Sequence, residues 1–434
     1  MGHLSTEEIV AALVSDRVGL VRDLAPQPRG PEEPVPPYLY TADLSHFDFR
    51  MAPRSERLNA GKGRTPDEAR LSALGEAVER YSAYHWDAKR VVVGPADATA
   101  ITPQDCVLYS PAQYAAGLPY ARWAVGDDAS WIDGVELLSG TAVQVPAALA
   151  YLVNPLPRFE DHVTTITSNG LSAGATLEQA VLGGLYEVIE RDALMITWLN
   201  RLPATTIRTP DTGCEAAAII RHYRWQNVTI RLFLIHTDQL PTVVMAVAEN
   251  PPGVLPLRVV GMGCDIDPVV AVDKAVFEMC QARPSEAARF RAQNPAERLK
   301  TYADVTEIDD HPGFHALPRN AHEFDFLSAT GASVELGDLD RHGSPDPASA
   351  LIEVAARLRE TGARVAYADI TAPDVRSVGI HVVRAFATGL QPIHFGYGEG
   401  RFGGRRLFDA PVRWGLRATP LTEDALNLCP HPLA

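Results

Sequence analysis

Two stretches of the chain carry nearly the same pattern of residues, and this pattern decides the fold that we expect. The first reads GRTPDEARLSALGEAVER at residues 63–80, and the second reads GATLEQAVLGGLYEVIER at residues 174–191. Glycine, threonine, alanine and the phrase Leu-x-Glu-x-x-Glu-Arg recur at one offset of 111 residues (187 − 76). A weaker third copy, FEMCQAR at residues 277–283, has glutamine in place of the second glutamate. The repetition predicts equivalent structural units.

Each of the first two copies predicts a helix with a defined start. Thr65 and Thr176 are suited to be N-caps, and a Glu or Gln stands three positions after each of them, as in a capping box. Residues three positions apart share one face of a helix, so each helix presents two carboxylates side by side. The two pairs are Glu76 with Glu79 and Glu187 with Glu190.

On an exposed helix, paired carboxylates repel each other by roughly a few tenths of a kcal/mol. The cost is much larger when the pair is buried. A solvated acidic face would explain one such helix. Repetition with the same caps and apolar neighbours favours a shared site instead. Converging carboxylates suit Mg²⁺, and arginines suit the phosphates that Mg²⁺ holds. We therefore expect metal ligands at Glu76, Glu79, Glu187, Glu190 and Glu278.

The composition bounds the class of protein. The chain has 434 residues, 46% hydrophobic residues and a formal charge of −15, which argues against a duplex nucleic-acid surface. No apolar run is long enough to span a bilayer. The start of the chain predicts a capped helix rather than a signal peptide. The five cysteines are scattered without a CxxC pair, which is typical of reduced thiols in a cytosolic protein. We expect a cytoplasmic protein.

The order of the predicted elements indicates the domain organisation. Residues 4–23 predict a helix and Ala25–Pro37 a proline-rich linker, so we expect a small N-terminal part (1–44) and one main domain (45–434). In the main domain, helical patterns lie near 66–86, 176–199, 268–293 and 346–361. Strand-like stretches lie near 90–94, 142–153, 228–237, 242–249, 257–266, 364–370 and 381–388. This alternation predicts an α/β (α+β) fold with repeated helix–strand units.

Four segments together resemble the YcaO family. They are GKGRTPDEARLSALGEAVERYSA (61–83), TSNGLSAGATLEQAVLGGLYEVIERDA (167–193), EMCQAR (278–283) and LNLCPHPLA (426–434). The resemblance covers roughly residues 45–434. It implies an ATP site without a Walker loop, built from acidic helices around Mg²⁺.

The resemblance also implies the chemistry. Family members use ATP to activate a backbone amide of a ribosomally made precursor peptide. A nucleophile adds to the amide carbonyl, and the oxygen is phosphorylated and leaves. With Cys, Ser or Thr the product is a thiazoline or oxazoline, and this cyclodehydration is our first expectation. Thioamide formation and closure of a macrocyclic amidine are the alternatives within the family, and a nucleotide-binding accessory protein is the alternative outside catalysis. A separate leader-peptide-binding partner and a homodimer are further expectations.

The resemblance assigns site residues by position. Contacts to ATP, its phosphates or the shell around them fall on Lys62, Ser72, Glu76, Glu79, Arg80, Ser168, Asn169, Glu187, Glu190, Arg191, Glu278, Gln281 and Arg283. Azoline-forming members end in a PxPxP-like tail that reaches the active site, and this role falls on Pro430, Pro432 and Ala434. The match is incomplete, because the last residue is alanine. His431 fits a packing role better than a proton carrier.

Two short motifs point to other functions. Residues 170–174 (GLSAG) fit the G-x-S-x-G elbow of hydrolases, but the expected helix cap, Thr176, comes four residues after the serine. Residues 398–403 (GEGRFG) fit G-x-G-x-x-G, but no βαβ unit follows. Arg401, Arg405 and Arg406 predict a solvated loop there, with phosphate or peptide binding as the alternative.

Overall fold

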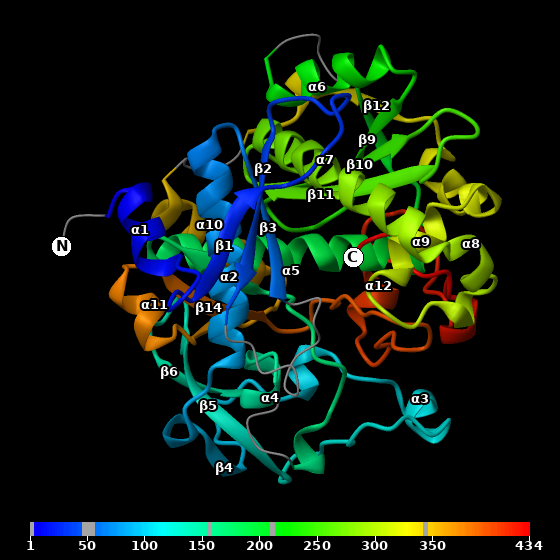
Figure 1. The fold of residues 1–434 in the computed structure, drawn as a ribbon. Coiled ribbons are helices and arrows are strands. Elements are labelled where there is room, and N and C mark those ends of the chain that lie inside the picture. The colour runs from blue at the N-terminus through cyan, green and yellow to red at the C-terminus, as the bar shows by residue number, and fades with distance from the viewer. Residues whose placement is uncertain (1–3, 46–56, 154–157, 209–212, 342–345) are drawn as a thin grey trace.

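The computed structural model describes residues 4–45, 57–153, 158–208, 213–341 and 346–434, and it has a mixed α/β fold with three sheets (Figure 1). A small sheet holds β1 (Val21–Pro26), β2 (Tyr38–Leu44) and β3 (Leu58–Gly63). A second sheet has the order β11 (Arg258–Asp265), β10 (Thr242–Glu249), β9 (Thr229–Ile235), β8 (Thr205–Arg208) and β12 (Ser333–Glu335). The third has the order β4 (Val92–Pro95), β5 (Asp128–Glu136), β13 (Val365–Asp369), β14 (His381–Ala387) and β7 (Leu171–Gly174), with β6 (Ala142–Pro146) beside β5.

The helices cover and separate these sheets. They are α1 (Thr6–Leu13), α2 (Pro66–Tyr84), α3 (Pro111–Ala115), α4 (Ala147–Ala150), α5 (Leu177–Leu199), α6 (Glu215–Arg224), α7 (Pro268–Gln293), α8 (Pro295–Arg298), α9 (Asp310–His315), α10 (Pro347–Glu360), α11 (Pro373–Ser377) and α12 (Arg406–Arg413). Helix α5 runs through the middle of the molecule (Figure 1) and packs against β7, β11, β14 and α10. Within the described ranges, no helix is both long and apolar enough to cross a bilayer.

The predicted repeat is a strand, a tight turn and a helix. Strand β3 leads into α2, β7 into α5 and β11 into α7. Thr65 and Thr176 N-cap their helices as predicted, each accepting the amide three residues later. The predicted capping box is wrong for both copies, because only its threonine half forms. In the first copy, Glu68 accepts the Arg64 amide instead of the Thr65 amide.

Small residues let each strand lie directly on its helix. A Cβ atom on Gly61 would stand 2.0 Å from the Ala73 nitrogen, and one on Gly261 would stand 2.3 Å from the Met279 nitrogen. The same atom on Gly174 would stand 2.5 Å from the Ala180 nitrogen. The alanine that recurs in every copy, at positions 69, 180 and 271, is completely buried. Glycine in the strand and alanine in the helix therefore fix the register between the two elements.

The N-terminal part differs from the predicted helix and linker. The helix at 4–23 is wrong beyond Leu13, because the chain turns at Ser15–Gly19 and continues as β1. The proline-rich segment packs onto the body, where Glu33 contacts Tyr223 and Arg283. Strand β2, before the expected boundary at residue 44, pairs with strand β3, after it. The division into two parts stays a prediction. The predicted strand at 142–153 ends at Pro146, after which α4 begins.

Candidate functional site

The first glutamate of every copy is held in the same way. Each accepts a hydrogen bond from a main-chain amide in or directly before the strand that leads into its helix. The pairs are Ala60 with Glu76 at 3.0 Å, Gly170 with Glu187 at 3.3 Å, and Met262 with Glu278 at 3.4 Å. One oxygen of each carboxylate is thus fixed by the backbone. The third copy, which looked weakest in sequence, is built like the other two.

The second glutamates lie in surroundings that disfavour their charge. Burial raises the pKa of Glu79 well above its usual value, and the neighbouring charges of Glu187 and Glu76 raise it further. Burial raises the pKa of Glu190 to about 7, and Glu278 and Glu187 act in the same direction. These interactions pass from α2 to α5 and from α5 to α7. The five glutamates therefore form one carboxylate cluster that all three units share.

Cations of the same motifs surround this cluster. Arg80 lies 3.6 Å from Glu76 and 3.8 Å from Glu79, and Arg191 contacts Glu190. Lys62 on β3 reaches across to Glu278 on α7 at 3.1 Å. Burial alone would raise the pKa of Glu278, but Lys62 and Arg191 outweigh it, and the pKa is lowered. The first and third units are thus joined through Lys62.

Arg384 is a member of this site that the sequence analysis missed. It lies on β14, is buried, and donates to the carbonyl oxygens of residues 149, 167 and 169 at 2.7, 2.6 and 2.8 Å. Burial lowers its pKa to about 10, while Glu187 and Glu79 act to raise it. The available signal was a single arginine in the middle of an apolar strand, HVVRAFA. A buried charge at such a position requires partners.

The segment Ser168–Asn169–Gly170 forms the turn that brings Glu187 into place. Gly170 has φ +85°, and a Cβ atom there would stand 2.6 Å from the Ala385 oxygen. Only glycine meets both conditions. Asn169 offers its carbonyl to Arg384, and the Ser168 carbonyl accepts the Leu171 amide at 2.7 Å. Residues 171–174 are strand β7, so the G-x-S-x-G match is not a nucleophile elbow.

Three predicted contacts lie elsewhere on the same helices. Ser72 is exposed on α2. The main-chain oxygen of Gln281 accepts from Gln27 at 3.2 Å. Arg283 pairs with Glu33 at 3.5 Å and donates to Asn250 at 3.0 Å. None of these contacts joins the residues to the carboxylate cluster, and their roles in binding stay predictions.

The C-terminal tail is buried except for its last residue. Trp198 donates to the Cys429 carbonyl at 2.8 Å, and a His315 ring nitrogen lies 2.6 Å from the Pro430 carbonyl. Pro430 through Leu433 are buried and Ala434 is exposed. Burial holds the pKa of His431 well below its usual value, and the Arg191 charge contributes to this lowering. The tail therefore packs against the C-terminal part of α5, and a neutral His431 fits the packing role. The catalytic role of Pro430, Pro432 and Ala434 stays a prediction.

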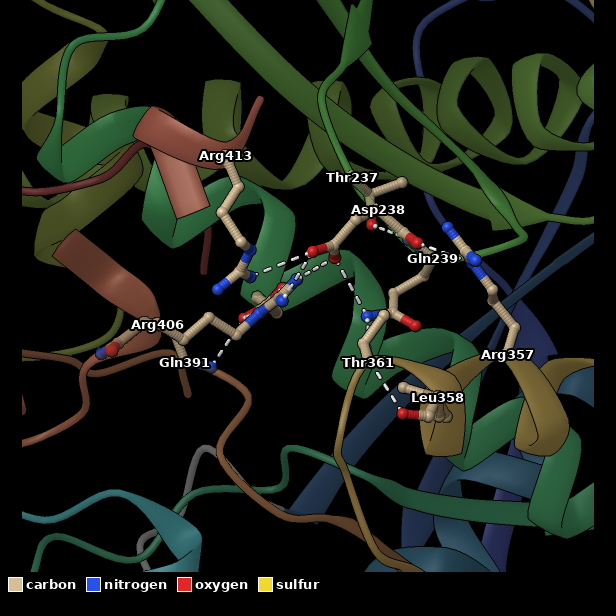
Figure 2. A network of polar contacts seen from close by, with 10 residues as sticks. Thr237, Asp238, Gln239, Arg357, Leu358, Thr361, Gln391, Arg406 and Arg413 are labelled. Atoms are coloured by element: carbon tan, nitrogen blue, oxygen red, sulfur yellow. Dashed lines mark hydrogen bonds and ion pairs between the residues drawn. The ribbon is translucent and has the colours of Figure 1, made fainter. Parts of the chain in front are cut away.

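A separate ion-pair network attaches α12 to α5 (Figure 2). Asp192, next to Arg191, accepts from Arg406 at 2.7 Å and from the Gln391 amide at 2.7 Å. Arg406 and Arg413 both point to Asp238 in Figure 2, at 2.6 and 3.1 Å. Burial would raise the pKa of Asp238, but the two arginines lower it to about 2. The predicted solvated loop is wrong for Arg406, which is buried in this network.

The donor set of the cluster suits a metal–nucleotide complex. Among the residues that the structure describes, no three His, Cys, Asp or Glu side chains form a ready-made metal cage. Mg²⁺ in nucleotide sites usually takes one or two carboxylates and completes its shell with phosphate oxygens and water. Desolvated carboxylates with raised pKa values, next to arginines that suit phosphates, fit that arrangement.

Comparison with known sequences gives two matches. The sequence model of the YcaO family, described as a YcaO cyclodehydratase that binds ATP and Mg²⁺, matches residues 60–391. An uncharacterised protein of Methanothermobacter thermautotrophicus is 29% identical over 342 residues, which are 76% of this chain and 81% of that protein. Residues 60–391, which the family model matches, contain all three acidic helices of the candidate site.

Comparison with solved structures shows the same fold. A heterocyclase in complex with substrate and cofactor superposes with a TM-score of 0.78 at 26% identity, over 99% of this chain and 57% of that chain. This chain thus spans little more than half the length of that heterocyclase. YcaO from Methanopyrus kandleri, bound with AMPPCP and Mg²⁺, has a TM-score of 0.63 at 23% identity, over 88% of this chain and 89% of that chain. At this identity the second likeness shows the fold alone.

Proposed function

Because the chain belongs to the YcaO family of ATP- and Mg²⁺-binding proteins, we propose that it is an enzyme that uses ATP to activate a backbone amide of a ribosomally made peptide. We propose cyclodehydration of Cys, Ser or Thr to thiazoline or oxazoline as the reaction. The heterocyclase likeness over nearly the whole chain supports this choice.

The observation that carries the proposal is the convergence of three separate strand–helix units on one carboxylate cluster. The charge of Glu187 on α5 raises the pKa of Glu79 on α2. The charge of Glu278 on α7 likewise raises the pKa of Glu190 on α5. A structural role alone does not explain why carboxylates with raised pKa values are brought together. Groups with such pKa values cluster at functional sites.

The residues have distinct parts in the proposed chemistry. ATP would supply the phosphoryl group that converts the amide oxygen into a leaving group. Glu76, Glu187 and Glu278, each fixed by a main-chain amide, are suited to hold Mg²⁺ in a preorganised position. Arg80 and Arg191 are suited to neutralise phosphate charge, which is most of what phosphoryl transfer requires. The C-terminal tail would present the peptide beside Arg191.

The first test is ATP turnover in variants of the second glutamates. We expect Glu79→Gln and Glu190→Gln to lower Mg²⁺-dependent phosphate release by about a hundredfold or more, because each removes a charged ligand but keeps the side-chain shape. Glu178→Gln is the matched control, since Glu178 is exposed on α5. Turnover near the wild-type rate in both site variants, with folding intact, would exclude the metal–phosphate role.

The second test identifies the product. Mass spectrometry of a precursor peptide treated with the protein, ATP and Mg²⁺ should show the loss of one water per modified residue. Replacement of one oxygen by sulfur would instead identify thioamide formation. A macrocyclic amidine also loses water, and fragmentation then locates the ring. We also propose a separate leader-binding partner, which full activity of the purified chain alone would make unnecessary.

A further inference from the structure

A cavity of about 70 Å³ adjoins the carboxylate cluster. This is several times the space that one water molecule needs. Three lining residues connect it to the cluster: Arg384, Asn169 before Gly170, and Val188 after Glu187. The other polar groups on its wall include Thr165, Thr167 and Arg401. The cavity is therefore next to the proposed phosphate chemistry and carries two arginines.

Arg401 is the unusual group on this wall. Its exposed fraction is 6%, and no carboxylate among the described residues lies within ion-pair distance of it. Within the described part of the chain, its guanidinium donates one hydrogen bond, to the Ile393 carbonyl at 3.5 Å, the edge of the normal range. Burial lowers the pKa of Arg401. The predicted solvated loop is thus wrong for this residue too.

The nearest acid in sequence, Glu399, is already engaged. Its carboxylate accepts from Tyr120 at 2.6 Å, from Thr165 at 2.8 Å and from Tyr109 at 3.2 Å. In contrast, Arg384 on the same wall has three carbonyl partners, and Arg406 has two aspartates. Among the described residues, Arg401 is thus a buried guanidinium with neither a carboxylate partner nor a full set of carbonyl acceptors.

A buried charge without a partner is costly, and a bound anion would relieve that cost. The guanidinium of Arg401 keeps unused N–H donors for such an anion. Asn169 adds a further polar group, because its Oδ1 atom is buried and has no partner among the described residues. Since the oxygen and nitrogen of an amide are assigned from their contacts, this side chain can equally present its NH₂ group.

We propose that the cavity is a binding site for a compact tetrahedral oxyanion, inorganic phosphate, with Arg401 as its principal ligand and Arg384 and Asn169 beside it. The source of the anion rests on the proposed function, in which ATP consumption releases phosphate next to this cavity. The alternative that the sequence left open for the 398–403 motif, phosphate binding, thus applies to one arginine of that loop.

The test is thermal unfolding of the full chain over a series of phosphate concentrations at constant ionic strength. A ligand that binds only the folded state raises the midpoint, here by on the order of 2 °C at saturating phosphate. We expect this rise in the wild type and not in Arg401→Gln. Arg405→Gln is the matched control, because Arg405 lies in the same loop and its side chain is 91% exposed.

Two results of this test would overturn the proposal. One is that phosphate does not raise the unfolding midpoint of the wild type, and the other is that it raises the midpoint of Arg401→Gln equally. An equal rise with acetate would identify a carboxylate site instead. If Arg401→Gln does not fold, Arg401→Met and direct calorimetric titration of the wild type with phosphate decide the same question.

The inactive variant Glu190→Gln separates this proposal from the proposed function. We expect it to keep the phosphate-dependent rise although it consumes no ATP. Loss of the rise in Glu190→Gln would mean that phosphate binds at the carboxylate cluster and not in the cavity. Full ATP turnover in Glu190→Gln would contradict the proposed function and leave the phosphate site standing.

Discussion

Two of the acidic residues of helix α5, Glu190 and Asp192, lie in opposite surroundings. Glu190 faces the carboxylate cluster, where burial raises its pKa to about 7 and Glu278 adds to the effect. Asp192 is completely buried on another side of the helix and has Arg406 and the Gln391 amide as partners. Asp192 thus has partners in the chain that compensate its charge, whereas Glu190 is in contact with Arg191 and burial still raises its pKa.

The difference separates two uses of a buried charge. The Asp192 network is complete and attaches the C-terminal segment to the central helix (Figure 2). The cluster around Glu190 is kept in an unfavourable electrostatic state, which a cation could relieve. Residues in such a state are typical of functional sites, where groups needed for activity lower the stability of the fold.

The largest expected effect on stability is the loss of the paired carboxylate. We expect Asp192→Asn to lower the free energy of unfolding by about 3 kcal/mol, because Arg406 then loses the charge of one of its two carboxylate partners. Denaturant unfolding measures this change. The double variant Asp192→Asn/Arg406→Met should recover part of the loss, and strictly additive losses would contradict the coupling.

The same measurement on Glu190→Gln should give the opposite sign. Burial outweighs the contact with Arg191, so removing the Glu190 charge should leave the free energy of unfolding unchanged or raise it by about 1 kcal/mol at neutral pH. A loss as large as that of Asp192→Asn would mean that Glu190 is a structural residue. The comparison between the two carboxylates would then fail.

The pH dependence of stability distinguishes the two regions next. The folded-state pKa of Glu190 is raised from 4.5 to about 7, so its stabilising contribution is present below pH 4.5 and is lost as pH rises through 7. The folded-state pKa of Asp238 is lowered from 3.8 to about 2, so its contribution is present above pH 3.8 and is lost as pH falls through 2. Wild type minus Glu190→Gln should isolate the first window, and wild type minus Asp238→Asn the second. Equal profiles would refute the assignment.

The smallest expected effect concerns Gly75, which precedes Glu76 on α2. A Cβ atom at this position would meet nothing within 4 Å. We therefore expect Gly75→Ala to raise the free energy of unfolding by about 0.5–1 kcal/mol, as for glycine in an open helical position. Gly61→Ala is the contrasting control, because its Cβ atom would collide with α2 and should destabilise the chain. A loss of stability in Gly75→Ala would show that this face of α2 is more crowded than the structure indicates.

Local patterns in the sequence predicted the repeated units well. Capping threonines and the apolar spacing placed α2 and α5, and the apolar spacing placed α7. Seven strands of the two larger sheets followed apolar runs, but β5, β7, β8 and β12 were not predicted. The N-terminal helix was extended too far because helical spacing continues past Leu13, whereas the turn at Ser15 is fixed by a hydrogen bond to Val21. Contacts between distant segments are not visible in such a pattern.

The candidate site shows the same limit. The glutamates were recognisable because they recur, but their fixation by main-chain amides depends on how each strand lies on its helix. Arg384 and Arg401 do not recur. The carbonyl partners of Arg384 lie more than 200 positions away in the sequence, and Arg401 lines a cavity together with Thr165 and Asn169. Arg283 occupies the arginine position of the third motif, but it pairs with Glu33 because the N-terminal segment packs on α7.

The three amides that hold the first glutamates have a use beyond structure. The N–H groups of Ala60, Gly170 and Met262 each touch one carboxylate of a different unit. Their nuclear magnetic resonance signals can therefore report separately on the three walls of the cluster, with no added label in the site. An ion that binds between two of the helices would shift two of these amide signals and leave the third unchanged. Titration with the ion would therefore show which helices contribute to binding first.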